Sequence, residues 1–201
     1  MKRTLPALIA LLAAPAMAEN ARELDAHEHG VGELNIAVDG DTVAMELHAP
    51  GADIVGFEYE ATSAEDRAAI DAAVAMLAKP LELFVLPAAA ECSVTKASAG
   101  LESEEGHDDH EDHGDHEEHA EHKEEHAEHE EHAEAESGHT EFHAEYLLAC
   151  ANTDALSGID FAYFTTFENA LELEVQVITA SGAQAFDVAR DMPSLDLRGM
   201  F

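Results

Sequence analysis

The sequence predicts an α+β fold: a predominantly antiparallel, sandwich-like β domain with two short helices and a long loop rich in His, Glu and Asp. Three observations predict it. Segments of alternating apolar and polar residues lie in both halves of the chain, 46% of all residues are apolar, and one central run has almost none. We therefore expect a single domain made of residues 19–101 and 139–201. A disordered, metal-binding loop at 102–138 interrupts it.

The first 18 residues predict a secretory signal peptide. They contain a basic Lys2-Arg3 start, an apolar run and the small residues of Ala16-Met17-Ala18. This run is too short to cross a bilayer as a helix, and no later stretch is as apolar. We expect cleavage after Ala18 and an exported chain without membrane insertion.

The segment that follows predicts a β-hairpin and a helix. Alternation from Glu33 to His48 around Asp39-Gly40-Asp41 is typical of two paired strands. The inward faces would carry Leu34, Ile36 and Val38, opposite Val43, Met45 and Leu47. Thr62-x-x-Glu65 resembles a capping box, and the helical spacing of Ile70, Val74 and Leu77 runs up to Lys79-Pro80.

The remaining elements are short strands and one further helix. We expect strands at 81–86 and 92–96, and alternation predicts a strand over 139–150 with Phe142 on its core face and Glu141 on its wet face. A short helix is expected around 154–166. Strands at 171–179 and 184–188 follow, joined by a Ser181-Gly182 turn.

Cys92 and Cys150 are the two cysteines of the chain. An exported protein with an even cysteine count usually pairs them, so we expect a disulfide; two buried free thiols are the alternative. The acidic central run lies wholly between these two residues. A disulfide would therefore bracket it.

The charge of the chain excludes one class of ligand. There are 44 Asp and Glu residues against 9 Lys and Arg, a formal net charge of −35. Nucleic acid is not an expected partner, because phosphate binding needs clustered basic residues. Residues 102–136 hold 18 of the 44 acids and a single base, Lys123. Half of the excess charge is thus concentrated in one segment.

That segment, which we call the His tract, carries nine histidines with acids in most of the gaps. Neutral imidazole is a preferred ligand of Zn(II), Cu(II) and Ni(II), and carboxylates can complete the coordination shell. A flexible chain can place such donors around an ion in several ways, so we expect several overlapping sites of modest affinity. The predicted metal ligands are His107, His110, His113, His116, His119, His122, His126, His129 and His132.

Catalysis is not expected from the sequence. His122-Lys-Glu-Glu-His126 matches the H-x-x-E-H pattern of one metalloprotease class. Such a match arises by chance in a segment built of His and Glu, and the apolar helix that would fix its geometry is absent from the sequence. We therefore expect a binding protein and no enzyme.

The sparser histidines outside the His tract predict one ordered site. His27 and His29 share a face if their segment is extended, and so do His139 and His143. Four imidazoles from two strands could form one four-coordinate site; the alternative is that all are ordinary surface residues. His48 is the weakest candidate, because the hairpin register places it opposite Glu33 as a cross-strand polar pair.

Five stretches of the chain resemble the family of ZrgA-type periplasmic zinc-binding proteins. They are HEHGVGELNIAVDGD (27–41), IVGFEYEA (54–61), LFVLPAAAECSV (83–94), HTEFHAEYLLAC (139–150) and FENALELEVQVITASGAQAF (167–186), together with the His-rich insertion between the cysteines. The family often has His at the position of Tyr59, so the resemblance carries no metal role to that residue.

The resemblance implies a soluble, periplasmic protein that captures and buffers Zn(II), assists zinc acquisition and passes metal to a zinc ABC importer. It supplies zinc as the metal; Cu(II), Ni(II) or Co(II) would bind in vitro through the same donors. We expect a monomer. Two other functions stay open: a detoxifying sponge for copper, nickel or excess zinc, and an accessory protein that docks on an envelope transporter through its acidic loop.

Overall fold

The computed structural model describes residues 29–103 and 139–201 of the 201-residue chain. The predicted signal peptide, His27 and the nine histidines of the His tract lie outside the described residues.

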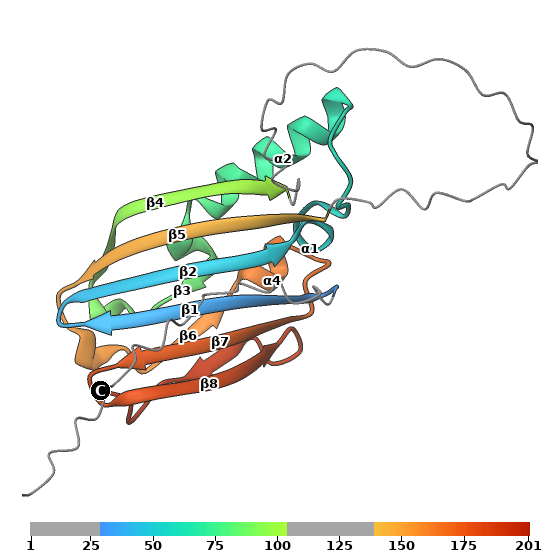
Figure 1. Ribbon diagram of the computed structural model, residues 1–201. Helices are drawn as coiled ribbons and strands as arrows, with labels where there is room; N and C mark the ends of the chain where they lie inside the picture. The colour runs from blue at the N-terminus through green and yellow to red at the C-terminus, as the bar shows by residue number, and fades with distance from the viewer. Residues whose placement is uncertain (1–28, 104–138) are drawn as a thin grey trace, which may run out of the picture.

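A curved six-stranded sheet is the main layer (Figure 1). Its strand order is β4-β5-β2-β1-β7-β8, and neighbouring strands are antiparallel except β1 and β7, which are parallel. The strands are β1 (Val31–Asp39), β2 (Thr42–Pro50), β4 (Cys92–Ser103), β5 (Thr140–Cys150), β7 (Glu172–Thr179) and β8 (Gly182–Ala189).

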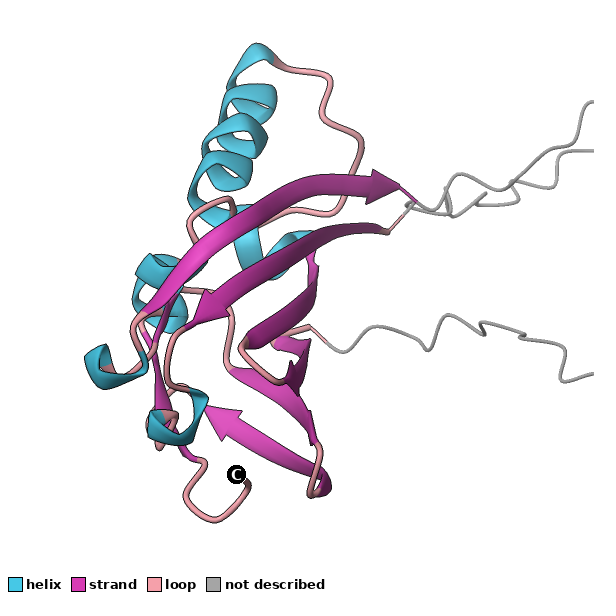
Figure 2. Cartoon of the chain, turned by 90° about the vertical axis from the view of Figure 1, so that its left-hand side faces the viewer, coloured by secondary structure: helices cyan, strands magenta, loops and turns pink. Residues whose placement is uncertain are grey.

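A second layer covers one face of this sheet (Figure 2). It contains a small sheet in the order β3-β6-β9, formed by β3 (Phe84–Val85), β6 (Gly158–Phe161) and β9 (Ser194–Asp196). The helical segments are α1 (Gly51–Val55), α2 (Ala64–Leu77), α3 (Pro80–Leu83), α4 (Tyr163–Thr166) and the 3-10 turns Ala88–Ala90 and Thr153–Ala155. The α+β, mostly antiparallel fold is confirmed.

Alternation along the strands explains why one face of the main sheet is covered. The residues of β2 and β5 that point inward, such as Leu47, Phe142 and Ala144, are fully buried, whereas those between them are partly or fully exposed. Burial of these apolar side chains contributes about 1.5–3 kcal/mol for each large one. The opposite face of the sheet carries mainly polar side chains together with the exposed Leu147 and Ile178, and no described element covers it in Figure 1.

The predicted hairpin is confirmed in its register, with Glu33 paired to His48, and its strands extend two residues further at each outer end, to Val31 and Pro50. The predicted first helix is also present, but its cap differs by one residue. The Ser63 side chain, and not that of Thr62, accepts a hydrogen bond from the Asp66 N–H at 2.9 Å. Both residues fit the capping preference, so the sequence did not separate them.

Two predicted elements are wrong. The strand expected at 81–86 is helix α3 followed by the two-residue β3, because Pro80 occupies the first helical turn, where proline is favoured. The helix expected around 154–166 is a 3-10 turn, strand β6 and only then α4. In β6, Ile159 and Phe161 are buried on either side of exposed Asp160, which is the two-residue period of a strand. The apolar residues of 154–166 also fit a helical spacing, so the sequence pattern did not distinguish the two structures.

The predicted disulfide between Cys92 and Cys150 is present. The two cysteines face each other in the register of β4 and β5, and the ladder continues from them to the pair of Ser103 and Thr140. The bridge therefore closes one end of this hairpin, and the connection that carries the His tract joins its other end. β4 also runs well past the strand end expected at Lys96.

Candidate metal centre

Three metal-ligating side chains come together on the uncovered face of the main sheet. Glu46 and His48 lie on β2, and His143 lies directly opposite His48 on the neighbouring strand β5. Because the residues next to them point inward and are buried, these three must point outward. Within the described residues this is the group whose ligand atoms all lie within 4.8 Å of one another. We call it the face site.

The face site has both imidazoles directed at one carboxylate. Glu46 Oε1 is 3.1 Å from His143 Nε2 and 3.5 Å from His48 Nε2. The two rings lie side by side, with their centroids 4.4 Å apart. Directly opposed residues on paired strands have their Cβ atoms about 5 Å apart, so the register itself brings these rings together.

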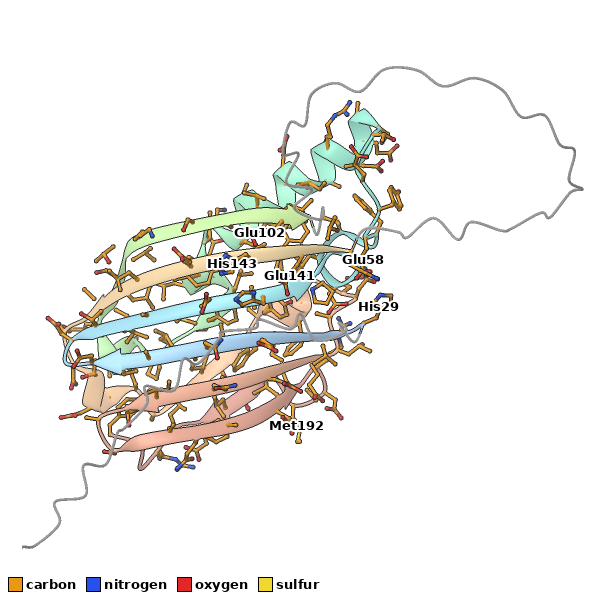
Figure 3. The ribbon with its side chains drawn as sticks, viewed as in Figure 1. His29, Glu58, Glu102, Glu141, His143 and Met192 are labelled. Atoms are coloured by element: carbon orange, nitrogen blue, oxygen red, sulfur yellow. A yellow bond between two sulfur atoms is a disulfide. The ribbon has the colours of Figure 1, made fainter. Side chains whose placement is uncertain are left out.

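Two further carboxylates hold the outer nitrogens of the same rings (Figure 3). Glu141 Oε2 lies 3.4 Å from His48 Nδ1, and Glu102 Oε1 lies 3.7 Å from His143 Nδ1. Metal-binding histidines in proteins typically donate their second ring N–H to a carboxylate. The contact of His48 with Glu141 is a hydrogen bond of this kind, whereas Glu102 lies beyond hydrogen-bonding distance of His143. Both Nε2 atoms face Glu46, and each can ligate an ion once it carries no proton.

The electrostatics of the cluster favour a cation. Hydrogen bonding to Glu141 raises the pKa of His48 above its ordinary value, partial burial acts against this, and the charges of Glu141 and Glu46 add to the increase. The hydrogen bond with His143 is the main cause that lowers the pKa of Glu46, and the charge of His48 adds to it. The carboxylates that stabilise a proton on His48 would also stabilise a metal ion, which has to displace that proton.

The surroundings of the face site are mainly negative, and Lys96, a basic residue nearby, is paired with Glu145 at 3.0 Å. The cross-strand row that contains His48 continues through Glu33, Glu174 and Asp187 on β1, β7 and β8. These three acids are exposed on the same face of the sheet. Their combined field attracts dications to this surface.

The face site is open on the side of β4. Gly100 is the register partner of His143, and a Cβ at this glycine would meet no atom within 4 Å. A hollow of about 220 Å³ lies there, lined by Ser98, Ala99, Gly100, Glu102, His143 and Glu145. An ion can therefore approach His143 from solvent.

The donor set fits zinc chemistry. Around a tetrahedral Zn(II), nitrogen and oxygen ligands are about 3.3 Å from one another, close to the Glu46 separations given above. Two imidazoles and one carboxylate are three protein ligands, the number found where the fourth position stays open for exchange. Such a site suits an ion that must enter and leave.

The structure separates the histidines that the sequence analysis grouped in one site. His143 belongs to the face site, whereas His29 Nε2 and His139 Nδ1 lie 3.1 and 3.0 Å from Glu58 Oε2. Figure 3 shows Glu58 and His29 at the end of the sheet, away from His143. His27 and the predicted ligands of the His tract lie outside the described residues.

Glu46, His48 and the carboxylates of Glu141 and Glu58 were not among the predicted ligands. Sequence reasoning ranked His48 as the weakest candidate ligand because it is the register partner of Glu33, and that pairing is present. The signal that could have found the site is the repeated pattern Glu-x-His, at 46–48 and 141–143, on the wet side of two alternating strands. What the sequence did not provide was the pairing of β2 with β5.

None of the helices among the described residues is long and apolar enough to span a membrane. The fold and the face site define a class of protein: a β-rich domain with a partly buried cluster of metal-ligating His and Glu side chains on its sheet. A family model described as ZrgA family zinc uptake protein matches residues 26–197. The chain therefore belongs to this family of zinc uptake proteins, as the resemblance implied. No curated protein matches it.

Proposed function

We propose that this protein captures Zn(II) in the periplasm, holds it at the face site and in the His tract, and supplies it to an ABC importer. The observation that carries the proposal is the cluster of Glu46, His48 and His143, with a carboxylate behind each ring. Membership of a zinc uptake family supports acquisition over detoxification. The signal-like sequence of residues 1–18 supports export.

Capture at the face site would proceed by ligand exchange. An incoming hydrated ion meets the exposed acids of the sheet, and Glu46, the most accessible of the three ligands, binds it first. His48 gives up its proton as its Nε2 takes the ion, and His143 completes the set of protein ligands. Release reverses these steps when a donor from another molecule occupies the open position.

The position of the His tract supports a shared role in capture. Its connection to the sheet begins after Ser103 and ends before Thr140, the last register pair of β4 and β5. His143 is three residues beyond Thr140, about 10 Å along an extended strand. Zinc held by the nearest part of the tract would thus have a short path to the face site.

Zinc titration calorimetry on the chain from Glu19 onward tests the proposal. We expect several equivalents of modest affinity and a tighter phase, and His48→Ala/His143→Ala should remove the tighter phase selectively. Deletion of 104–136 should remove the modest equivalents and retain binding at the sheet. If the deletion variant folded and bound no zinc, the ordered site would be eliminated.

A charge-matched control separates ligation from a general electrostatic effect. Glu46→Gln and Glu174→Gln each remove one carboxylate from the same face of the sheet, but Glu174 lies two strands away on β7. Only Glu46→Gln should weaken the tighter phase by an order of magnitude or more. Equal effects of both substitutions would show that zinc is held by the field of the surface.

A further inference from the structure

A second group of metal-ligating side chains lies at the end of the main sheet, outside the face site. His29 lies in the turn that leads into β1, and His139 immediately precedes β5. Both β1 and β5 are antiparallel to the strand β2 between them, so they begin at the same end of the sheet. Glu58 reaches this end from the segment that follows α1.

The backbone at this end brings Glu58 close to both histidines. Helix α1 packs closely on the start of β5: a Cβ at Gly51 would collide with the Thr140 side chain and with the carbonyl of Phe57. The glycine thus allows the chain to turn tightly across the strand ends. Glu58 follows Phe57 directly and contacts His29 and His139 through the same oxygen.

The residue types of this group are those of a zinc ligand set. Its ligand atoms do not all lie within 4.8 Å of one another as those of the face site do, so the two exposed imidazoles would turn toward each other on binding. Its carboxylate is sheltered, with a side chain only 12% exposed, whereas the histidines it contacts are accessible to solvent. Two imidazole nitrogens converge at hydrogen-bonding distance on one oxygen. The described residues place no Lys or Arg in ion-pair contact with Glu58, so protonated histidine or a metal ion is what neutralises it.

A buried and incompletely paired carboxylate beside the group is an independent sign of a cation. Asp53 is 2% exposed; its Oδ1 accepts a hydrogen bond from the Gly30 N–H at 2.8 Å, and its Oδ2 has no partner among the described atoms. Burial raises the pKa of Asp53 and the charge of Glu58 adds to this increase, whereas the hydrogen bond from Gly30 and the charge of His29 act against it. A buried carboxylate without a countercharge is costly, and a cation at Glu58 would offset that cost.

We propose that Glu58, His29 and His139 form a second Zn(II) site, the end site, with the charge of Asp53 behind it. His139 is four residues from His143, about 13 Å along an extended chain, so the two sites hold separate ions. The proposal rests on the proposed function only in taking zinc as the ion. It assigns the two sequence-predicted histidines His29 and His139 to a site distinct from that of His143.

Zinc protection from chemical modification tests the end site residue by residue. The chain from Glu19 onward is treated with diethyl pyrocarbonate, with and without zinc chloride, and carbethoxylation of each histidine is measured by peptide mass spectrometry. We expect zinc to slow modification of His29 and His139 together, several-fold. Glu58→Gln should abolish this joint protection, and the matched exposed control Glu60→Gln should retain it.

The face site serves as the internal reference in the same samples. Continued protection of His48 and His143 in Glu58→Gln shows that the variant is folded and that zinc is available. If zinc protected His48 and His143 but left His29 and His139 unprotected, or protected just one of them, the end site would be refuted and the proposed function would stand. If zinc protected neither pair, the face site would fail as well.

Discussion

The face site and the end site use the same residue types in opposite ways. In the face site the histidines are the sheltered members, with His48 and His143 32% and 23% exposed, and Glu46 is 47% exposed. In the end site Glu58 is 12% exposed, and His29 and His139 are 66% and 53% exposed. The side chains most protected from solvent are the two imidazoles in the face site and the carboxylate in the end site.

The difference teaches how the fold sets affinity. Paired strands with a buried layer beneath them fix both imidazoles of the face site before an ion arrives, so little ordering is required on binding. At the end site the two histidines flank strand starts and must be ordered around a fixed carboxylate. We therefore expect the face site to bind zinc more tightly and the end site to exchange it faster.

The largest expected effect is on the stability of the fold, and it should leave the difference in zinc affinity between the two sites unchanged. Replacing both cysteines, as Cys92→Ser/Cys150→Ser, opens a loop of 58 residues and should lower the free energy of unfolding by about 4 kcal/mol. The bridge lies at the end of the β4–β5 hairpin remote from both sites, so zinc affinities of the folded variant should not change. Urea unfolding and zinc titration measure the two quantities. Loss of the face site in a variant of native circular dichroism would show that the bridge, and not the strand register, aligns the rings.

The next largest effect should be a loss of packing beneath β2 that weakens zinc binding at the face site alone. Leu47 is fully buried between Glu46 and His48, and Leu47→Ala should cost about 3 kcal/mol of stability. Loosening of β2 should weaken zinc binding at the face site and not at the end site. Leu173→Ala, at an equally buried position on β7, is the control: it should cost similar stability without affecting either site. Equal weakening of the face site by both variants would refute its dependence on local packing.

A smaller effect should come from the carboxylates behind the face-site rings. Glu141→Gln removes the acceptor that orients His48 and should weaken zinc about tenfold, measured near pH 8 so that proton competition is small. Glu102→Gln should have less effect, because Glu102 is largely exposed and lies farther from its ring. A larger loss of zinc affinity in Glu102→Gln than in Glu141→Gln would contradict the role assigned to the shorter contact of Glu141 with His48.

The smallest expected effect is a pH dependence at the end site. Because burial raises the pKa of Asp53, the folded protein takes up this proton more readily than the unfolded chain. Lowering the pH below neutral, through the raised pKa, should therefore stabilise the wild type relative to Asp53→Asn. Near neutral pH, zinc should stabilise the wild type more than the variant. Melting temperatures with and without zinc test both statements, and parallel pH curves of the two proteins would contradict the first.

The sequence predicted the strands and left the metal site incomplete, for one physical reason. Alternation is a local signal, so the hairpin, the strand at 139–150 and the outward direction of His143 could all be predicted. The face site depends on a contact between residues 95 positions apart, because β5 pairs on one side with β4, the strand before it, and on the other with the distant strand β2. No local pattern encodes that pairing. His48 was therefore matched only to Glu33.

The end site shows a second limit of what the sequence alone could predict. The sequence indicated that His29 and His139 were candidate ligands, but it gave no reason to include Glu58, one of the chain's 44 acidic residues. What selects Glu58 is the tight turn around Gly51 and the common end at which β1 and β5 begin. Both are properties of the folded chain.

Anomalous diffraction at the zinc edge tests the central claim most directly, using crystals of the chain from Glu19 onward grown with zinc. We predict a peak between Glu46 and the Nε2 atoms of His48 and His143, with Zn–N distances of about 2.0–2.1 Å. The contradicting result would be zinc density elsewhere in the crystal while the two rings still contact Glu46 directly, with no metal between them.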